Sequence, residues 1–94
     1  MNQREHWRPV LIAQTKLWQA KPYQQLLSEL VDEQVYEVHH ETKACQVEVS
    51  ILENKNDYLH VIVSVDDGSI PASFRPLTEV FIVEKPKQPA VAKS

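Results

Sequence analysis

Residues 34–65 read QVYEVHHETKACQVEVSILENKNDYLHVIVSV, and this stretch decides the fold. Apolar and polar residues alternate along it with a period of two, which is typical of β-strands that bury one face. The pattern predicts three strands, whose inward positions are Tyr36, Val38 and His40, then Cys45, Val47, Val49 and Ile51, and then Leu59, Val61, Val63 and Val65. Consecutive strands joined by short turns form an antiparallel meander.

The inward positions also predict how these strands pair. Turns over residues 41–44 and 53–57 would give the pairs His40–Cys45, Val38–Val47, Tyr36–Val49, Ile51–Leu59, Val49–Val61 and Val47–Val63. A slip by one residue would expose the apolar set, so the pattern selects a register that keeps these side chains on one face.

The meander is expected to continue beyond residue 65. Asp66–Ser69 contains an Asp-Gly pair and predicts a turn. The next strand would hold Ile70, Ala72 and Phe74 on its inward face. Residues 77–79 fit a helical turn, and Val80–Val83 fits a short strand.

The N-terminal part has the 3.6-residue period of helices. Apolar residues from Trp7 to Trp18 predict a helix that begins near residues 5–8 and ends near Ala20, with Pro9 in its first turn. Pro22 starts a second predicted helix, whose apolar stripe is Tyr23, Leu26, Leu27, Leu30 and Val31. Helical spacing explains Trp7, Trp18 and Tyr23 as core residues, and the alternative is that they line a groove.

These elements predict an α+β fold, with two N-terminal helices packed on one face of a four- to five-stranded antiparallel β-meander. A single domain would occupy residues 1–84. Residues 85–94, KPKQPAVAKS, are polar and contain proline, and they are expected to form a disordered tail.

Charge is distributed unevenly along the chain. The net charge is −3, but residues 1–28 carry +3, residues 29–84 carry −9 and residues 85–94 carry +3. An acidic body repels phosphate, so nucleic acid is not an expected partner. The acidic strands either pack beside the basic helices or offer a surface to a basic partner.

Composition excludes several classes of protein. Cys45 is the only cysteine and Gly68 the only glycine, so an intramolecular disulfide, CxxC metal sites and glycine-rich phosphate loops are excluded. No apolar run approaches the length of a membrane span, and the N-terminus lacks the pattern of a signal peptide. We therefore expect a cytoplasmic protein with no cofactor, no metal and no membrane partner.

Two groups of residues are candidate ligand or metal sites. The predicted hairpin makes His40 and Cys45 neighbours, and such a pair can form a reactive thiolate or contribute to a zinc site. A second polar group is expected at one end of the sheet and contains Asp66, Asp67, Arg75 and Glu79. Turn chemistry and a structural ion pair explain that second group without a ligand.

The outward positions of the strands form a mixed surface. Val35, Leu52 and Ile62 are apolar, and Glu37 and Glu48 are acidic. These five residues are the candidate contacts for a partner, whereas the simpler interpretation is an ordinary solvated face with a few apolar residues.

Residues 65–86, VDDGSIPASFRPLTEVFIVEKP, resemble a segment of small uncharacterised bacterial proteins. The shared pattern is a D-D-G turn followed by F-x-P-L-T-E-x-F-I, which runs here from Asp66 to Ile82. The resemblance implies a bacterial α+β protein and supplies no activity and no site residue.

These observations together favour a small protein-interaction or regulatory module that binds another protein, and a homodimer is compatible with that function. The alternative is a small enzyme or ligand binder that uses the Asp66 group or the His40–Cys45 pair. No set of catalytic residues is evident, so an enzyme is the less favoured class.

Overall fold

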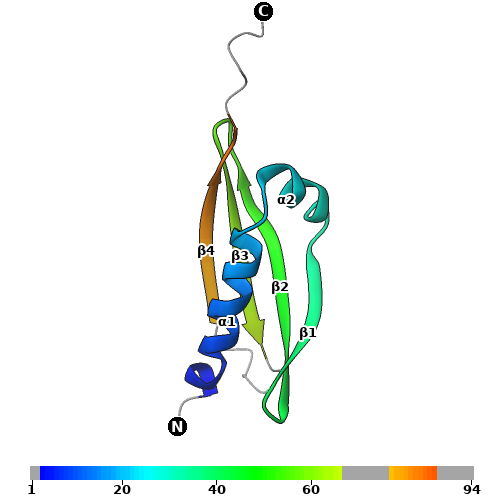
Figure 1. Ribbon diagram of the computed structural model, residues 1–94, viewed down its shortest axis with the longest axis vertical. Coiled ribbons are helices and arrows are strands. Elements are labelled where there is room, and N and C mark those ends of the chain that lie inside the picture. Colours follow the sequence, from blue (N-terminus) through cyan, green and yellow to red (C-terminus); the bar gives the residue numbers. More distant parts are fainter. Residues whose placement is uncertain (1–2, 67–76, 87–94) are drawn as a thin grey trace, which may run out of the picture.

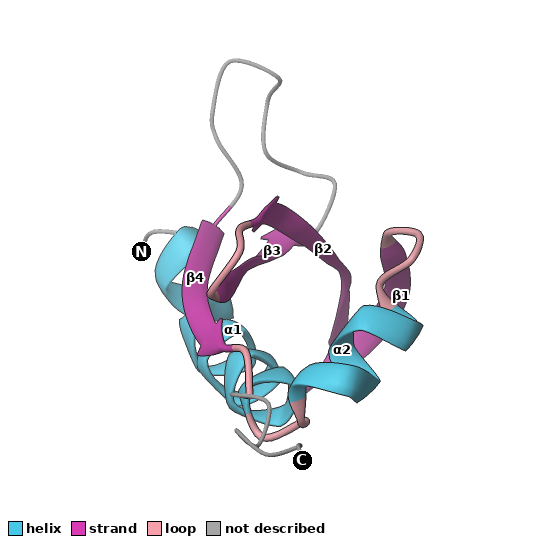
Figure 2. Ribbon diagram, turned by 90° about the horizontal axis from the view of Figure 1, so that it is seen from above, coloured by secondary structure: helices cyan, strands magenta, loops and turns pink. Residues whose placement is uncertain are grey.

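The computed structural model describes residues 3–66 and 77–86, which form one layer of helices and one layer of sheet (Figures 1 and 2). The elements are α1 (Gln3–Gln19), α2 (Tyr23–Glu29), β1 (Gln34–His40), β2 (Lys43–Asn54), β3 (Tyr58–Asp66) and β4 (Leu77–Glu84). The strands form an antiparallel sheet in the order β1-β2-β3-β4, and both helices lie on one face of it (Figure 2). The predicted α+β meander is confirmed. The predicted strand from Ile70 to Phe74 lies outside the described residues.

Both helices differ slightly from the prediction. Because α1 begins at Gln3, Pro9 lies in its second turn and not in its first. Proline has no N–H, so α1 loses one backbone hydrogen bond at this point and then continues. Pro22 precedes α2 in an extended conformation, and α2 ends at Glu29, so the predicted apolar position Val31 lies beyond it and is exposed.

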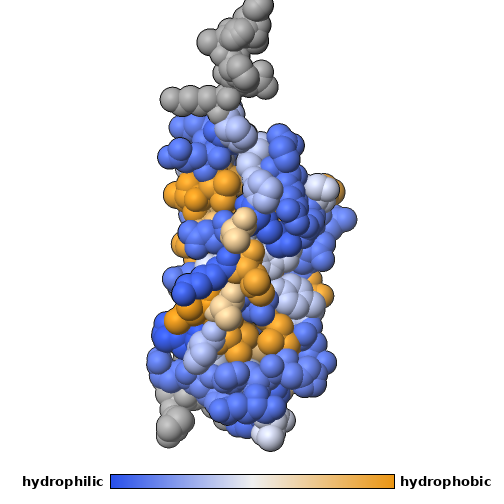
Figure 3. Space-filling model, in the orientation of Figure 1, coloured by the Kyte–Doolittle hydropathy of each residue, from blue (hydrophilic) through white to orange (hydrophobic). Residues whose placement is uncertain are grey.

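The core lies between the helices and the inward face of the sheet. Trp7, Leu11, Leu26 and many strand residues are almost completely buried; the strand members are Cys45, Val47, Val49, Leu59, Val61, Val63, Val65, Leu77 and Phe81. Trp18 is buried too, and Tyr23 packs against the cluster, so the core interpretation of these aromatic residues is confirmed. The helix-bearing surface also shows apolar side chains among hydrophilic ones (Figure 3).

The first hairpin has a register that differs from the prediction by two residues. Its turn contains only Glu41 and Thr42, so His40 lies opposite Lys43 and Val38 lies opposite Cys45. Glu41 has a φ of 60°, a left-handed conformation that two-residue hairpin turns require. A shift of two leaves every side chain on its predicted face, so the inward set is correct although the pairs are wrong.

The second hairpin differs from the prediction in the same way. Ile51 pairs with Val61, Val49 with Val63 and Val47 with Val65. The register then shifts between Ile51 and Glu53, where Leu52 forms an irregularity of the β-bulge type.

The last strand is longer than predicted. Residues 77–79 belong to β4 and not to a helical turn, and β4 pairs with β3 from Val65–Leu77 to Tyr58–Glu84. Its inward residues Leu77 and Phe81 complete the core under α1, which lies over β3 and β4. The described residues contain no helix that is long and apolar enough to cross a membrane.

Candidate functional site

The face of the sheet opposite the helices has no covering layer among the described residues, and we call it the uncovered face (Figure 2). On β1 it contains Val35, Glu37 and His39. On the other strands it contains every second residue, from Ala44 to Ser50 on β2, from Tyr58 to Asp66 on β3 and from Thr78 to Glu84 on β4. Leu52 and Glu53 at the bulge complete it. All five predicted partner-contact residues lie on this face. Sequence patterning therefore placed them correctly, while their role in binding stays a prediction.

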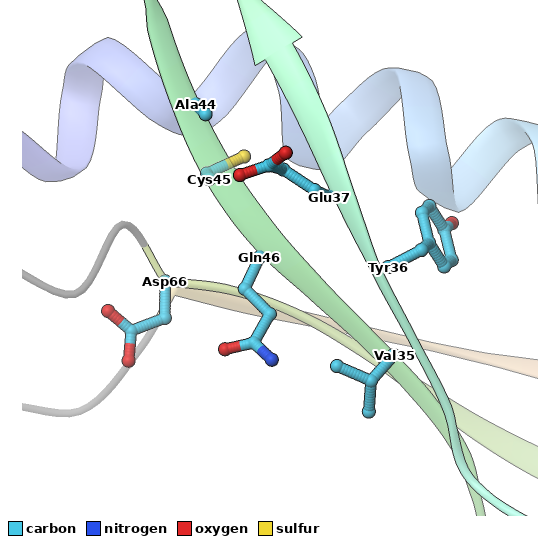
Figure 4. A pocket seen from close by; sticks show the side chains of 7 residues that line it. All are labelled: Val35, Tyr36, Glu37, Ala44, Cys45, Gln46 and Asp66. Carbon is cyan, nitrogen blue, oxygen red and sulfur yellow. The ribbon is translucent and has the colours of Figure 1, made fainter.

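A shallow depression opens on this face between β1, β2 and the end of β3 (Figure 4). Its polar lining comes from Glu37, Gln46 and Asp66, which follow one another across the three strands because Glu37 pairs with Gln46 and Gln46 pairs with Asp66. Val35 adds an apolar wall, and the Tyr36 side chain points away toward the helices. We call the depression lined by Val35, Glu37, Gln46 and Asp66 the acidic hollow.

Glu48 lies directly beside the acidic hollow, opposite Val35 on β1 and Ser64 on β3. Its side chain is half-buried, and this burial raises the pKa of its carboxyl group above the ordinary value. The neighbouring carboxylates of Glu33 and Asp66 raise that pKa further, because like charges oppose ionisation. Burial and the neighbouring carboxylates therefore disfavour the ionised form of the Glu48 side chain.

Acidic side chains outnumber basic ones at the described positions of this face. The uncovered face carries Glu37, Glu48, Glu53, Asp66 and Glu84 and has no lysine or arginine at any of its described positions. Its histidines each approach one carboxylate, with His39 Nε2 3.3 Å from Glu37 and His60 Nδ1 3.6 Å from Glu53. Lys55, in the loop after β2, lies 3.9 Å from Glu53 through its Nζ atom.

The β3–β4 half of the uncovered face carries a strip of apolar side chains among polar ones. Ile62 pairs with Val80, and Ile82 lies two residues further along β4. Val80 and Ile82 are 47% and 56% exposed, which is high for such side chains. Sequence reasoning predicted a strand over Val80–Val83 but missed both residues as part of this face, because the partner of that strand was not predicted. The alternation of Leu77, Phe81 and Val83 with Val80 and Ile82 was the available signal.

The predicted His40–Cys45 pair does not form as a cross-strand pair. Cys45 is 3% exposed, belongs to the core and lies opposite Val38. A thiol this deeply buried lacks the exposure that a catalytic nucleophile needs.

The predicted polar group at the sheet end is also not assembled as expected. Asp66 lies on the uncovered face, whereas Glu79 pairs with Val63 and lies on the helix side, near Arg8 of α1. Opposite faces separate these two carboxylates. Asp67 and Arg75 lie outside the described residues.

A different cluster involves His40. One ligand atom each of His6, His40 and Glu41 lies within 4.8 Å of the others, where α1 begins and the β1–β2 hairpin turns. Sequence reasoning missed His6 because its approach to His40 depends on tertiary packing, and no short-range pattern signals it. These are the described residues best placed to hold a metal ion.

Comparisons of this chain with models of protein families, with curated proteins and with solved structures give no match. The interpretation of function therefore depends on the geometry and charge of the surfaces described above.

Proposed function

We propose that the protein acts by binding another protein with a basic surface, and that the uncovered face receives this partner. The observation that carries the proposal is the set of carboxylates around the acidic hollow without a lysine or arginine among the described positions of the face. Lysine and arginine side chains of a partner would add ion pairs to the carboxylates of Glu37 and Glu48 on this face. Such charge complementarity supplies specificity and accelerates association.

The raised pKa of Glu48 supports the same interpretation. A carboxylate whose charged form is disfavoured in the free protein gains more from a nearby cation than a fully solvated carboxylate does. Binding a basic side chain beside Glu48 would compensate for its burial and for the repulsion from Glu33 and Asp66.

The apolar half of the face supports a protein partner over a small cation. The exposed Val80 and Ile82 and the half-buried Ile62 form an apolar strip beside the carboxylates. Protein interfaces combine an apolar centre with charged surroundings, whereas a bound ion uses only the polar part. Face-to-face pairing of two copies would bring acidic residues against acidic residues, so a different protein is the better occupant.

Charge reversal tests this proposal. The wild-type protein is used to capture partners from a lysate of its own cells at moderate salt, beside a Glu37→Lys variant. Asp57→Lys, in the exposed β2–β3 loop, is the matched control because it changes the net charge equally outside the uncovered face.

The proposal expects one partner that the wild type and Asp57→Lys capture in stoichiometric amount and that Glu37→Lys loses. Raising the salt concentration should weaken this capture, because the attraction is between charges. A partner retained fully by Glu37→Lys, or no salt-sensitive partner at all, would contradict the proposal.

A further inference from the structure

The cluster of His6, His40 and Glu41 brings together groups that are far apart in the sequence. His6 lies in the first turns of α1, His40 is the last residue of β1 and Glu41 begins the two-residue turn. One ligand atom of each lies within 4.8 Å of the other two. Two imidazole nitrogens and a carboxylate oxygen are a common ligand set for zinc in proteins.

The Nε2 atom of His6 is the second, independent observation. It is buried and has no hydrogen-bond partner among the described residues. Buried polar nitrogens in folded proteins nearly always have a partner, so this atom requires an explanation. A bound cation or its water ligand at this end of the molecule supplies one.

Aromatic packing is the competing explanation of the cluster. The His6 ring meets Trp7 edge-on, with centroids 4.7 Å apart, and lies 5.4 Å from the His40 ring. Trp7 and His40 are themselves 6.2 Å apart. Packing accounts for the positions of these rings. A phenylalanine in place of His6 would pack equally well and would bury no unpaired nitrogen, so packing does not explain why the residue is histidine. The presence of Glu41 beside both imidazoles is also not explained by packing.

We propose that His6, His40 and Glu41 bind a divalent transition-metal ion of the Zn²⁺ type. Ligand bonds of about 2.0–2.1 Å place the donors of a tetrahedral site about 3.3 Å apart, so the observed atoms need to close by only about 1.5 Å. Rotation of the exposed Glu41 side chain provides part of this movement. Three protein ligands leave the fourth position to water, and the ion joins the start of α1 to the β1–β2 turn.

Metal titration of the untagged protein tests the proposal. Co²⁺ binding is followed by visible absorption, and Zn²⁺ is then added as a competitor. His6→Phe and His40→Phe each remove a ligand while keeping an aromatic ring beside Trp7, and Glu41→Gln removes the carboxylate at constant size. Circular dichroism verifies that each variant is folded.

Two variants are matched controls. His39→Phe changes the neighbouring histidine, whose side chain is 73% exposed and lies on the other face of β1. Cys45→Ala removes the buried thiol on the strand that faces His40. Cys45 lies two residues beyond Lys43, which is the cross-strand partner of His40.

The proposal expects the wild type to bind one Zn²⁺ per chain. The dissociation constant should rise at least about tenfold in His6→Phe, His40→Phe and Glu41→Gln, because even the loss of an outer-shell contact commonly costs that much. His39→Phe and Cys45→Ala should bind as the wild type does. Absence of stoichiometric binding at about 0.1 mM free Zn²⁺ would overturn the proposal, since that corresponds to an affinity too weak for a built site. Equal loss in either control would overturn it as well.

Discussion

The indole N–H of Trp18 donates a hydrogen bond of 2.8 Å to the hydroxyl of Tyr36, which in turn donates one of 2.6 Å to Gln14 Oε1. Trp18 and Gln14 belong to α1, and Tyr36 belongs to β1, the edge strand far from the β3–β4 half of the sheet that α1 covers. Burial raises the pKa of the Tyr36 hydroxyl, so it stays protonated as both donor and acceptor. The chain of hydrogen bonds therefore fixes β1, and with it one wall of the acidic hollow, to the helical layer.

Tyr36→Phe should destabilise the protein measurably. The substitution keeps the ring but leaves the buried Trp18 N–H and the Gln14 amide oxygen without this partner, which should cost about 1–2 kcal/mol of unfolding free energy. The melting temperature should fall by about 4–8 °C for each kcal/mol. Thermal unfolding of Tyr36→Phe is compared with that of Tyr58→Phe, which removes a hydroxyl from the uncovered face and should be nearly neutral. Equal effects of the two substitutions would contradict this role of Tyr36.

Leu59 and Leu52 should respond very differently to truncation. Leu59 is fully buried, so Leu59→Ala should cost about 2–5 kcal/mol through lost burial and the cavity left behind. Leu52 is 52% exposed at the bulge, and Leu52→Ala should change stability by no more than about 0.5 kcal/mol. Urea unfolding of the two variants checks this difference. Similar losses would mean that the bulge buries Leu52 in solution.

Glu48→Gln should stabilise the protein near neutral pH. The pKa of Glu48 is raised in the folded state by burial, by Glu33 and by Asp66, so the folded protein favours the protonated form. The stabilisation from protonated Glu48 is complete below its unfolded pKa and is lost as the pH rises through its folded pKa. A neutral glutamine avoids that loss, so the advantage of Glu48→Gln should be present at neutral pH and should disappear as the solution is acidified.

Melting temperatures of wild type and Glu48→Gln across the acidic to neutral range measure this effect. Glu84→Gln, at the other end of the uncovered face, controls for the removal of one negative charge. A Glu48→Gln variant that is less stable than the wild type at neutral pH would show that burial and the neighbouring carboxylates do not disfavour the ionised form of Glu48.

The sequence predicted the sheet faces better than the strand pairs. Alternation assigns Val47 and Val63 to the core regardless of register, because a shift of two residues conserves the face. The pairs themselves depend on the turns. At the first turn Glu41 adopts a left-handed conformation that asparagine or glycine normally supplies, so the sequence there contains no signal for a two-residue turn.

The surface residues show the same difference between what periodicity predicts and what depends on tertiary packing. Val35, Glu37 and Glu48 could be placed on one face by periodicity alone, and the structure places them there. The approach of His6 to His40 and the separation of Asp66 from Glu79 could not be predicted, because both depend on how α1 and β4 pack on the sheet. Local patterns carry no information on such contacts.

The central claim is that the uncovered face receives a basic protein, and site-specific photo-crosslinking tests it most directly. A photoreactive residue is introduced at Gln46, in the acidic hollow, and separately at Lys16, an exposed position on α1. Both proteins are irradiated in lysate of their own cells, and the crosslinked products are identified by mass spectrometry. We predict that Gln46 yields one dominant adduct, to a lysine- and arginine-rich segment of another protein, and that Lys16 does not. Adducts from Lys16 alone, or from neither position, would contradict the account.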